Sequence, residues 1–240
     1  KYLDFCKEFD DLFIDKEKKL KLRKINKDDK INIGFVSPDF KSHSVSFFLK
    51  DILNKIDKNK FNITAYSNLP VFEQDSLSFE LKKTFNHWID IYSLDDEETR
   101  NIIINNKTDI LIDLAGFTLG NRINLFKKRS APVQLLWLGY CNSLGIKNMD
   151  YIIADKNLIK NNEENSYTEK ILYMPKIWNA LSKPIDIPDI NLGIFRSEKF
   201  CFGSLNNFLK ISDKTIKVWS KILNLTGSNL ILKSSSNDSK

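Results

Sequence analysis

The sequence is poor in the features that mark several large classes of protein. It has three cysteines in 240 residues, far apart and with no CxxC pair. This argues against a disulfide scaffold or a zinc site and favours a reducing compartment, so we expect a cytoplasmic protein. There is no run of about 18 apolar residues, and no membrane span is predicted. The first residues have the pattern of neither a signal peptide nor a transit peptide.

The residues that are present fit a folded globular protein. The chain is 42% hydrophobic and 28% charged, with a net charge of +6. Lysine is spread along the chain, and no basic block is interleaved with aromatic residues. We therefore interpret the charge as general surface composition and predict no nucleic-acid partner. A local exception is the KKR run at residues 127–129, which a phosphate ligand or an acidic partner could use.

Apolar runs alternate with helical patterns along most of the chain. Helices are predicted over 1–24, 45–56, 73–85, 95–106 and 121–128. Strands are predicted over 31–37, 61–67, 87–92, 109–114, 132–138, 151–154 and 170–173. Such alternation indicates βα units, so the predicted fold class is α/β, with a Rossmann-like, mostly parallel sheet flanked by helices.

A loop-like segment over 176–198 is followed by a second, shorter pattern. It predicts strands over 200–205 and 230–233 and a helix over 213–223. Two strands and one helix cannot bury a core by themselves, so we expect a second domain that is begun and not finished. The predicted division is an N-terminal helix and linker over 1–29, a Rossmann-like catalytic domain over 30–195, and the start of a nucleotide-binding domain over 196–240.

The first candidate site is His43 in the loop SPDFKSHSV, between a predicted strand and a predicted helix. A side chain there lies at the carboxyl end of its strand, beside free amides of a helix start, which suits an anion or a sugar. Histidine can also handle protons near neutral pH. The alternative is a loop histidine that only caps or packs locally.

Two glycine-bearing loops follow the strands 109–114 and 132–138. Gly116 and Gly120 belong to the first, and Gly139 and Gly145 to the second. Glycine allows tight turns and close backbone approach to a ligand. Their spacing is not GxGxxG, so a dinucleotide fingerprint is not supported and ordinary structural turns remain the alternative.

A third candidate is Lys210 in NNFLKIS, just before the predicted N-cap Ser212. A lysine at this place can reach a phosphate, and the alternative is a solvated side chain. Cys141 has no histidine near it in sequence, so a catalytic thiol is disfavoured.

Five stretches of the sequence carry a family resemblance. They are INIGFVSPDFKSHSVSFFL, DILIDLAGFTLGNR, APVQLLWLGYCNSLG with MDYIIAD, EKILYMP, and FGSLNNFLKIS with VWSKIL. In order and approximate spacing they resemble the catalytic region of the O-GlcNAc transferase and SPINDLY-like protein glycosyltransferases. The predicted N-terminal helix resembles the segment that joins the family's tetratricopeptide repeats to its catalytic domain.

This resemblance implies the first half of a two-domain GT-B-type glycosyltransferase. Such an enzyme moves a sugar from a UDP-sugar donor, in most members studied UDP-N-acetylglucosamine, to a Ser or Thr of a protein acceptor. SPINDLY proteins use GDP-fucose, so the donor stays open. The resemblance implies catalytic roles for His43, beside the sugar and acceptor, and for Lys210, on the donor phosphates. Substrate or nucleotide contacts are implied for Thr118, Leu138, Gly139, Cys141, Asn142, Ser143 and Asn207.

No metal is implied, and the sequence has no Asp-x-Asp motif. In the family, most nucleotide contacts lie in the part of the second domain that is missing here. We therefore expect an inactive fragment of a protein O-glycosyltransferase. Phe117 and Cys141 depart from residues common in the family, which leaves a non-catalytic, degenerate binding module as the alternative.

Overall fold

The computed structural model describes residues 1–12, 20, 24, 26, 29–182, 200–206 and 208–233. The chain divides into two compact units, Lys1–Ile185 and Asp186–Lys240. We call them unit 1 and unit 2.

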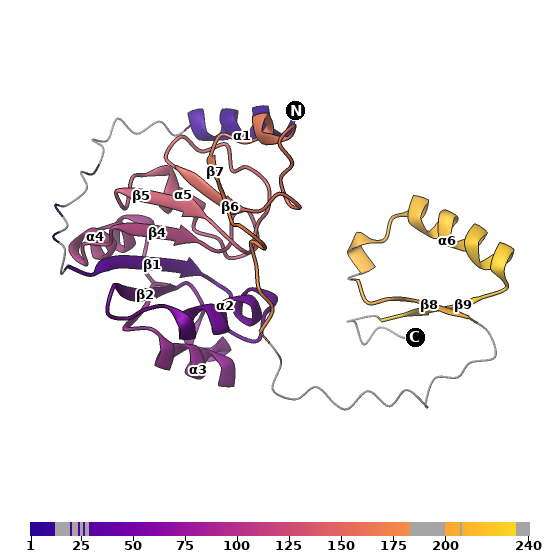
Figure 1. Cartoon of the computed structure of the whole chain (residues 1–240), viewed down its shortest axis with the longest axis horizontal. Coiled ribbons are helices and arrows are strands. Elements are labelled where there is room, and N and C mark those ends of the chain that lie inside the picture. Colours follow the sequence, from indigo (N-terminus) through magenta and orange to yellow (C-terminus); the bar gives the residue numbers. More distant parts are fainter. Residues whose placement is uncertain are drawn as a thin grey trace. The chain divides into compact units, whose positions relative to one another are not determined.

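Unit 1 is built on a seven-stranded sheet with the order β3-β2-β1-β4-β5-β6-β7 (Figure 1). Its strands are β1 (Ile31–Ser37), β2 (Phe61–Ser67), β3 (His87–Asp90), β4 (Ile110–Asp113), β5 (Val133–Leu136), β6 (Tyr151–Ala154) and β7 (Lys170–Tyr173). Every neighbouring pair is parallel. In the central register, Val36 lies opposite both Tyr66 of β2 and Asp113 of β4. The predicted fold class is therefore confirmed.

Helices cover both faces of this sheet. They are α1 (Tyr2–Asp11), α2 (Ser44–Lys55), α3 (Ser76–Thr84), α4 (Asp96–Asn105) and α5 (Ile123–Lys127), with short 3-10 turns η1 (Val71–Glu73) and η2 (Glu164–Ser166). Successive strand residues point to opposite faces. Thus Phe35 packs into a core cluster with residues of α2 and α3, and Val36 packs into another with residues of α4 and α5. The result is a three-layer α/β/α unit.

The helix boundaries follow local chemistry. Asp75 and Asp95 cap α3 and α4 by accepting the backbone N–H of Ser78 and Glu98. The N-terminal helix was predicted over 1–24. It spans Tyr2–Asp11, and most of the remaining predicted range lies outside the described residues. Helix α5 is shorter than the predicted 121–128.

Unit 2 contains β8 (Cys201–Ser204), η3 (Phe208–Lys210), α6 (Asp213–Thr226) and β9 (Asn229–Leu232). The two strands pair in parallel, and Ser212 is the N-cap of α6, as predicted. Gly227 ends the helix in the left-handed region, with φ at 63°. None of the described residues of unit 2 is fully buried, so its apolar side chains have no closed core among these elements.

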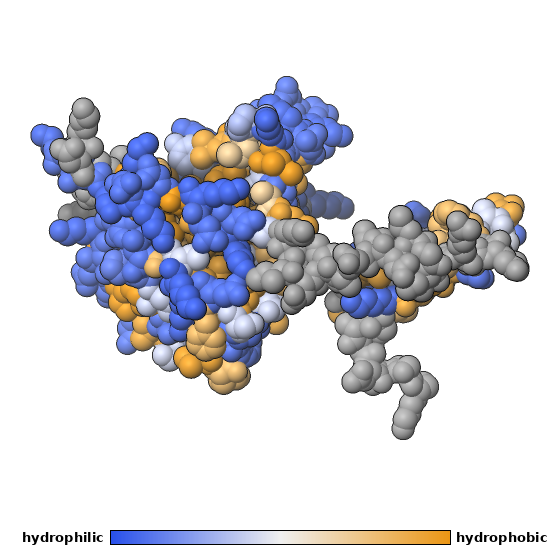
Figure 2. All heavy atoms as spheres, turned by 60° about the horizontal axis from the view of Figure 1, so that its bottom comes forward, coloured by the Kyte–Doolittle hydropathy of each residue, from blue (hydrophilic) through white to orange (hydrophobic). Residues whose placement is uncertain are grey.

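The surface of unit 1 mixes charges of both signs. Hydrophilic residues cover much of the face seen in Figure 2, with smaller hydrophobic areas between them. Across the described parts of the chain, every helix is too short or too polar to cross a membrane.

Candidate functional site

The candidate site lies at the carboxyl edge of the sheet in unit 1. Strand β1 pairs with β2 on one side and with β4 on the other, so the connections after β1 and β4 run in opposite directions. Open α/β sheets bind ligands at such a switch point. A cleft of about 460 Å³ opens there. It is lined by Pro38, Asp39, Lys41, His43, Val45, Asn68, Pro70, Glu73, Tyr92, Thr118, Leu119, Gly120 and Gly139.

His43 is the N-cap of α2 and lines this cleft. Its Nδ1 accepts the backbone N–H of Val45 at 3.3 Å and lies 3.7 Å from Oδ2 of Asp39. Its side chain is 44% exposed, so a ligand can reach it. Because Nδ1 accepts a hydrogen bond, the neutral imidazole carries its proton on Nε2, which then is a donor. Local capping and a role in the cleft are therefore compatible for this residue.

Three hydrogen bonds fix the loop that carries His43. The hydroxyl of Ser37 accepts the N–H of Asp39 at 2.9 Å, and Ser46 donates its hydroxyl to the Asp39 carbonyl at 2.6 Å. The carboxylate of Asp75 accepts the N–H of Ser42 at 2.7 Å. Burial raises the pKa of Asp39, and the nearby charges of His43 and Lys41 oppose this rise. The cleft therefore places a half-buried carboxyl beside an imidazole.

The first glycine loop, residues 114–120, is organised by Asp113 at the end of β4. This buried carboxyl accepts the N–H groups of Ala115 and Gly116 at 2.9 and 3.1 Å. Burial raises its pKa to about 6, although both hydrogen bonds act in the opposite direction. The hydroxyl of Thr118 donates to the Ala115 carbonyl at 2.8 Å, which leaves the Thr118 oxygen able to accept from a ligand in the cleft.

The second glycine loop, residues 138–145, begins with a strained backbone. Leu138 has a φ of 79°, a region that residues with a side chain rarely adopt. Gly139 follows and lines the cleft. A Cβ on Gly139 would lie 2.0 Å from the carbonyl oxygen of Leu114 in the first loop. The two loops thus meet with no room for a side chain between them, as expected for loops that follow neighbouring strands.

Four other predicted contact residues lie in the second loop but are not among those lining the cleft: Leu138, which is buried in the core, Cys141, Asn142 and Ser143. Ser143 is 2% exposed and donates its hydroxyl to the buried Glu169 carboxylate at 2.6 Å. The carbonyl of Cys141 accepts the hydroxyl of Tyr167 at 2.9 Å, and burial raises the pKa of the Cys141 thiol. Asn142 is exposed. In unit 1, then, the structure brings together His43, Thr118 and Gly139 from the predicted set.

Two predicted site residues, Lys210 and Asn207, belong to unit 2. Lys210 ends η3 and is exposed, two residues before the N-cap of α6. Asn207 lies outside the described residues.

The KKR run pairs within unit 1. Lys127 donates to the Phe9 carbonyl at 2.7 Å, and Lys128 pairs with Glu97 at 2.8 Å. Arg129 pairs with Asp150. These contacts account for the cluster without a phosphate or an acidic partner.

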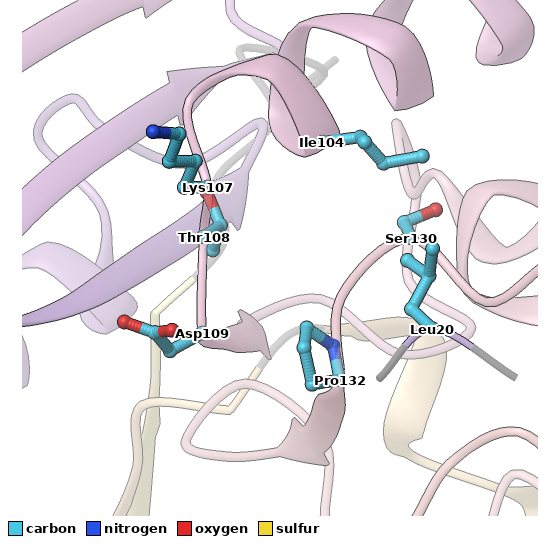
Figure 3. Close-up of a pocket in the computed structure, with 7 residues that line it drawn as sticks. All are labelled: Leu20, Ile104, Lys107, Thr108, Asp109, Ser130 and Pro132. Atoms are coloured by element: carbon cyan, nitrogen blue, oxygen red, sulfur yellow. The ribbon is translucent and has the colours of Figure 1, made fainter. Parts of the chain in front are cut away.

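A second cavity, of about 280 Å³, lies at the opposite edge of the sheet, where β4 and β5 begin (Figure 3). Three of its polar side chains already have internal partners. Thr108 bonds the Tyr66 hydroxyl, Asp109 accepts the N–H of Asn32, and Ser130 donates to the Leu125 carbonyl. Since the connections do not diverge at this edge, the cleft with His43 is the better candidate.

Sequence reasoning missed several cleft residues. Asn68 comes directly after β2, and Tyr92 comes shortly after β3. Asp39 and Lys41 lie within the loop that was singled out for His43 alone. Asn68 and Tyr92 could both have been predicted from the rule that residues just after parallel strands gather at one edge of the sheet.

The chain is similar to known proteins over most of its length. Residues 4–180 match the family described as glycosyl transferase family 41. The chain is 33% identical over 194 residues to a protein of Hordeum vulgare named probable UDP-N-acetylglucosamine–peptide N-acetylglucosaminyltransferase SPINDLY. The match covers 80% of this chain and 21% of that relative. A protein of Arabidopsis thaliana with the same name, ending in SEC, is 25% identical, with 81% and 21% covered.

A solved structure extends the similarity to the fold. A mutant of the O-GlcNAc transferase of Thermobaculum terrenum superposes with a TM-score of 0.86 and 27% identity. The match covers 97% of this chain and 44% of that one. The chain thus spans about one-fifth of the curated relatives and under half of the solved relative. With the family match over most of unit 1, we conclude that the chain belongs to glycosyl transferase family 41.

Proposed function

We propose that this chain forms part of a protein O-glycosyltransferase that moves a sugar from a UDP-sugar to a Ser or Thr hydroxyl of a protein. N-acetylglucosamine is the proposed sugar, because the names of the SPINDLY and SEC relatives specify it. The proposed compartment is the cytoplasm.

The observation that carries this proposal is the cleft at the switch point between β1 and β4, with His43 on its wall. A sugar offers hydroxyl groups that both donate and accept. Around it the cleft presents the Nε2–H of His43, the hydroxyl oxygen of Thr118 and the backbone at Gly139. This mixture of donors and acceptors on a rigid sheet edge suits a polar, ring-shaped ligand.

The chemistry requires that the negative charge that develops on the departing diphosphate be offset. The bond between the anomeric carbon and the diphosphate breaks, the acceptor oxygen bonds to that carbon, and the proton of the acceptor hydroxyl is released to water. The departing diphosphate gains negative charge, which a lysine and helix-terminal amides stabilise in a partly dry site. Lys210, beside the N-terminus of α6, is proposed for this role, and no metal is needed if these groups suffice. In the isolated 240-residue chain we propose little or no transfer, because unit 2 has no closed core among its described residues to hold Lys210.

The rival function is a non-catalytic binding module, suggested by Phe117 and Cys141. Neither residue lines the cleft. Phe117 packs edge-on against Phe9 and Tyr140, and the Cys141 backbone holds Tyr167. Both departures are therefore accounted for by loop packing, which leaves the cleft intact and favours the catalytic function.

The test compares the chain's two histidines in the full-length protein. His43→Asn keeps an N-cap side chain and removes the imidazole, while His87→Asn on β3 is the matched control. Transfer of radiolabelled N-acetylglucosamine from UDP-N-acetylglucosamine to protein should fall about 100-fold or more in His43→Asn and stay unchanged in His87→Asn. Wild-type turnover in His43→Asn would refute the assignment. Donor binding by calorimetry without any transfer in the wild type would instead support the binding module.

A further inference from the structure

Helix α1 is bound to both loops of the candidate site. The hydroxyls of Tyr2 and Tyr140 form a hydrogen bond, and Tyr2 also donates to the Ser143 carbonyl at 3.1 Å. The ring of Phe9 packs edge-on against Phe117, with centroids 6.3 Å apart. Phe117 in turn packs edge-on against Tyr140 at 5.8 Å. These four side chains, the α1 aromatic cluster, join the helix to the first loop through Phe117 and to the second loop through Tyr140.

The backbone of both loops fits against this cluster without spare room. Gly116 has a φ of +57°, and a Cβ there would lie 2.5 Å from the Cβ of Tyr140. Gly145 has a φ of +67°, and a Cβ there would lie 2.5 Å from the Cβ of Cys6 on α1. Cys6 is 1% exposed. Displacement of α1 or of Tyr140 therefore leaves these turns without their packing partners.

Polar contacts fix α1 to the segments that follow each loop. The buried Lys127 ends α5, after the first loop, and donates to the Phe9 carbonyl at 2.7 Å. Its ammonium group also lies 3.9 Å from the centroid of the Phe9 ring. After the second loop, the N–H of Lys147 donates to the Asp10 carboxylate at 3.1 Å. Helix α1 thus contacts both loops and the segment that follows each loop.

The cluster residues are chain neighbours of residues that line the cleft. Thr118, Leu119 and Gly120 follow Phe117 directly, and Gly139 precedes Tyr140. A displacement of about 1 Å at a positioning group can cost on the order of 100-fold in rate. The position of α1 therefore bears on the geometry of the cleft, although α1 itself contributes no residue to its lining.

We infer that α1 is a positioning element of the cleft, and that Phe9 and Tyr2 hold the two glycine loops in their cleft-forming conformation through Phe117 and Tyr140. The consequence for turnover rests on the proposed function, whereas the consequence for loop order does not. The same helix offers an internal control, since Phe5 is 68% exposed on its outer side.

The experiment measures amide hydrogen exchange in the 240-residue chain, over peptides covering residues 113–122 and 137–146. Phe9→Ala should raise exchange about tenfold in both peptides by lowering the free energy of local opening. Tyr2→Phe removes one oxygen atom and should raise exchange in the second peptide, and Phe9→Leu should restore most of the protection. Phe5→Ala should leave both peptides unchanged. Confinement of the Phe9→Ala effect to α1, or equal effects of Phe5→Ala and Phe9→Ala, would overturn the inference.

If Phe9→Ala does not fold, Tyr2→Phe still tests the inference. Tyr2 is 45% exposed, so loss of its hydroxyl leaves the core intact. If Tyr2→Phe does not change hydrogen exchange in the peptide over residues 137–146, the inference is also contradicted. In the full-length protein, Phe9→Ala should lower kcat about tenfold with a smaller change in KM for the donor, as expected when groups are misplaced and not removed. If the wild type transfers no sugar, the proposed function fails while the exchange data still decide the role of α1.

Discussion

The carboxylate of Asp75 accepts the backbone N–H of Ser42 at 2.7 Å, so the first residue before α3 holds the loop that presents His43. The same carboxylate accepts the N–H of Ser78 at 3.0 Å as the N-cap of α3. One side chain thus serves a helix end and the candidate site together.

Replacement of Asp75 by alanine should separate these two roles. We expect a loss of about 1–2 kcal/mol in the free energy of unfolding, because the cap and the Ser42 hydrogen bond both disappear. The His43 imidazole resonances should also shift in an NMR spectrum. Asp95→Ala is the matched control, since it removes a similar cap from α4 without touching residues 38–43. If the His43 imidazole resonances are the same in Asp75→Ala and Asp95→Ala, Asp75 does not hold the loop that presents His43.

Stability should depend on pH through Asp75. Burial acts to raise the pKa of this carboxyl, but hydrogen bonds from Ser42 and Ser78 outweigh it and hold the pKa at about 2, below the ordinary value of 3.8. A lowered folded-state pKa means that the ionised form stabilises the fold above pH 3.8, and that this contribution is lost as the pH falls through about 2.

Urea unfolding of the wild type and of Asp75→Asn, from pH 6 to pH 2, measures this contribution. The difference between the two free energies should be constant above about pH 5 and shrink toward pH 2. Other carboxyl groups cancel in the comparison because both proteins contain them. Two curves that stay parallel to pH 2 would show that Asp75 is not stabilised as a carboxylate.

Gly139→Ala should be strongly destabilising. Its added methyl group would lie 2.0 Å from the Leu114 carbonyl oxygen, a backbone atom that cannot turn aside. We expect a loss of about 3 kcal/mol in the free energy of unfolding and a displaced first loop. Gly203→Ala in β8 is the comparison, because its methyl group meets nothing within 4 Å and should change stability by about 0.5 kcal/mol or less. A Gly139→Ala protein as stable as the wild type would disprove the close approach of the loops.

Lys210→Ala should abolish transfer in the full-length protein without changing its melting temperature. The side chain is exposed, so its loss removes little packing, whereas loss of a charge that is proposed to meet the leaving diphosphate should slow turnover by about 100-fold or more. Lys214→Ala in the first turn of α6 removes a nearby exposed charge and should retain activity. Similar losses in both variants would indicate a general effect of positive charge on that surface.

The strands and most helices could be predicted because their signals are local. FNITAYS has β-branched and aromatic residues, DDEE suits a helix N-terminus, and Pro38 bounds the strand over residues 31–37. His43, Thr118 and Gly139 were placed correctly at one sheet edge because parallel strands end together.

Long-range contacts set the rest, and no local pattern encodes them. Ser143 was expected to contact the ligand because it belongs to the second glycine loop. In the structure its hydroxyl donates a hydrogen bond to the Glu169 carboxylate. The place of Asn68 directly after β2 was a signal, but its hydrogen bond to the Gly120 carbonyl at 2.8 Å, which fixes the loop across the cleft, is a long-range contact that the sequence does not show. The contacts between α1 and both loops depend equally on the finished sheet.

The placement of α1 also sets an order of events in folding. Tyr2 and Tyr140 are 138 positions apart, so their contact closes a long loop and must wait until β4 and β5 have paired. During synthesis the helix leaves the ribosome long before its partners, with the apolar side chains of Cys6 and Phe9 uncovered. We therefore expect α1 to dock among the last steps, after the sheet it covers, and the cleft to take its final form only then.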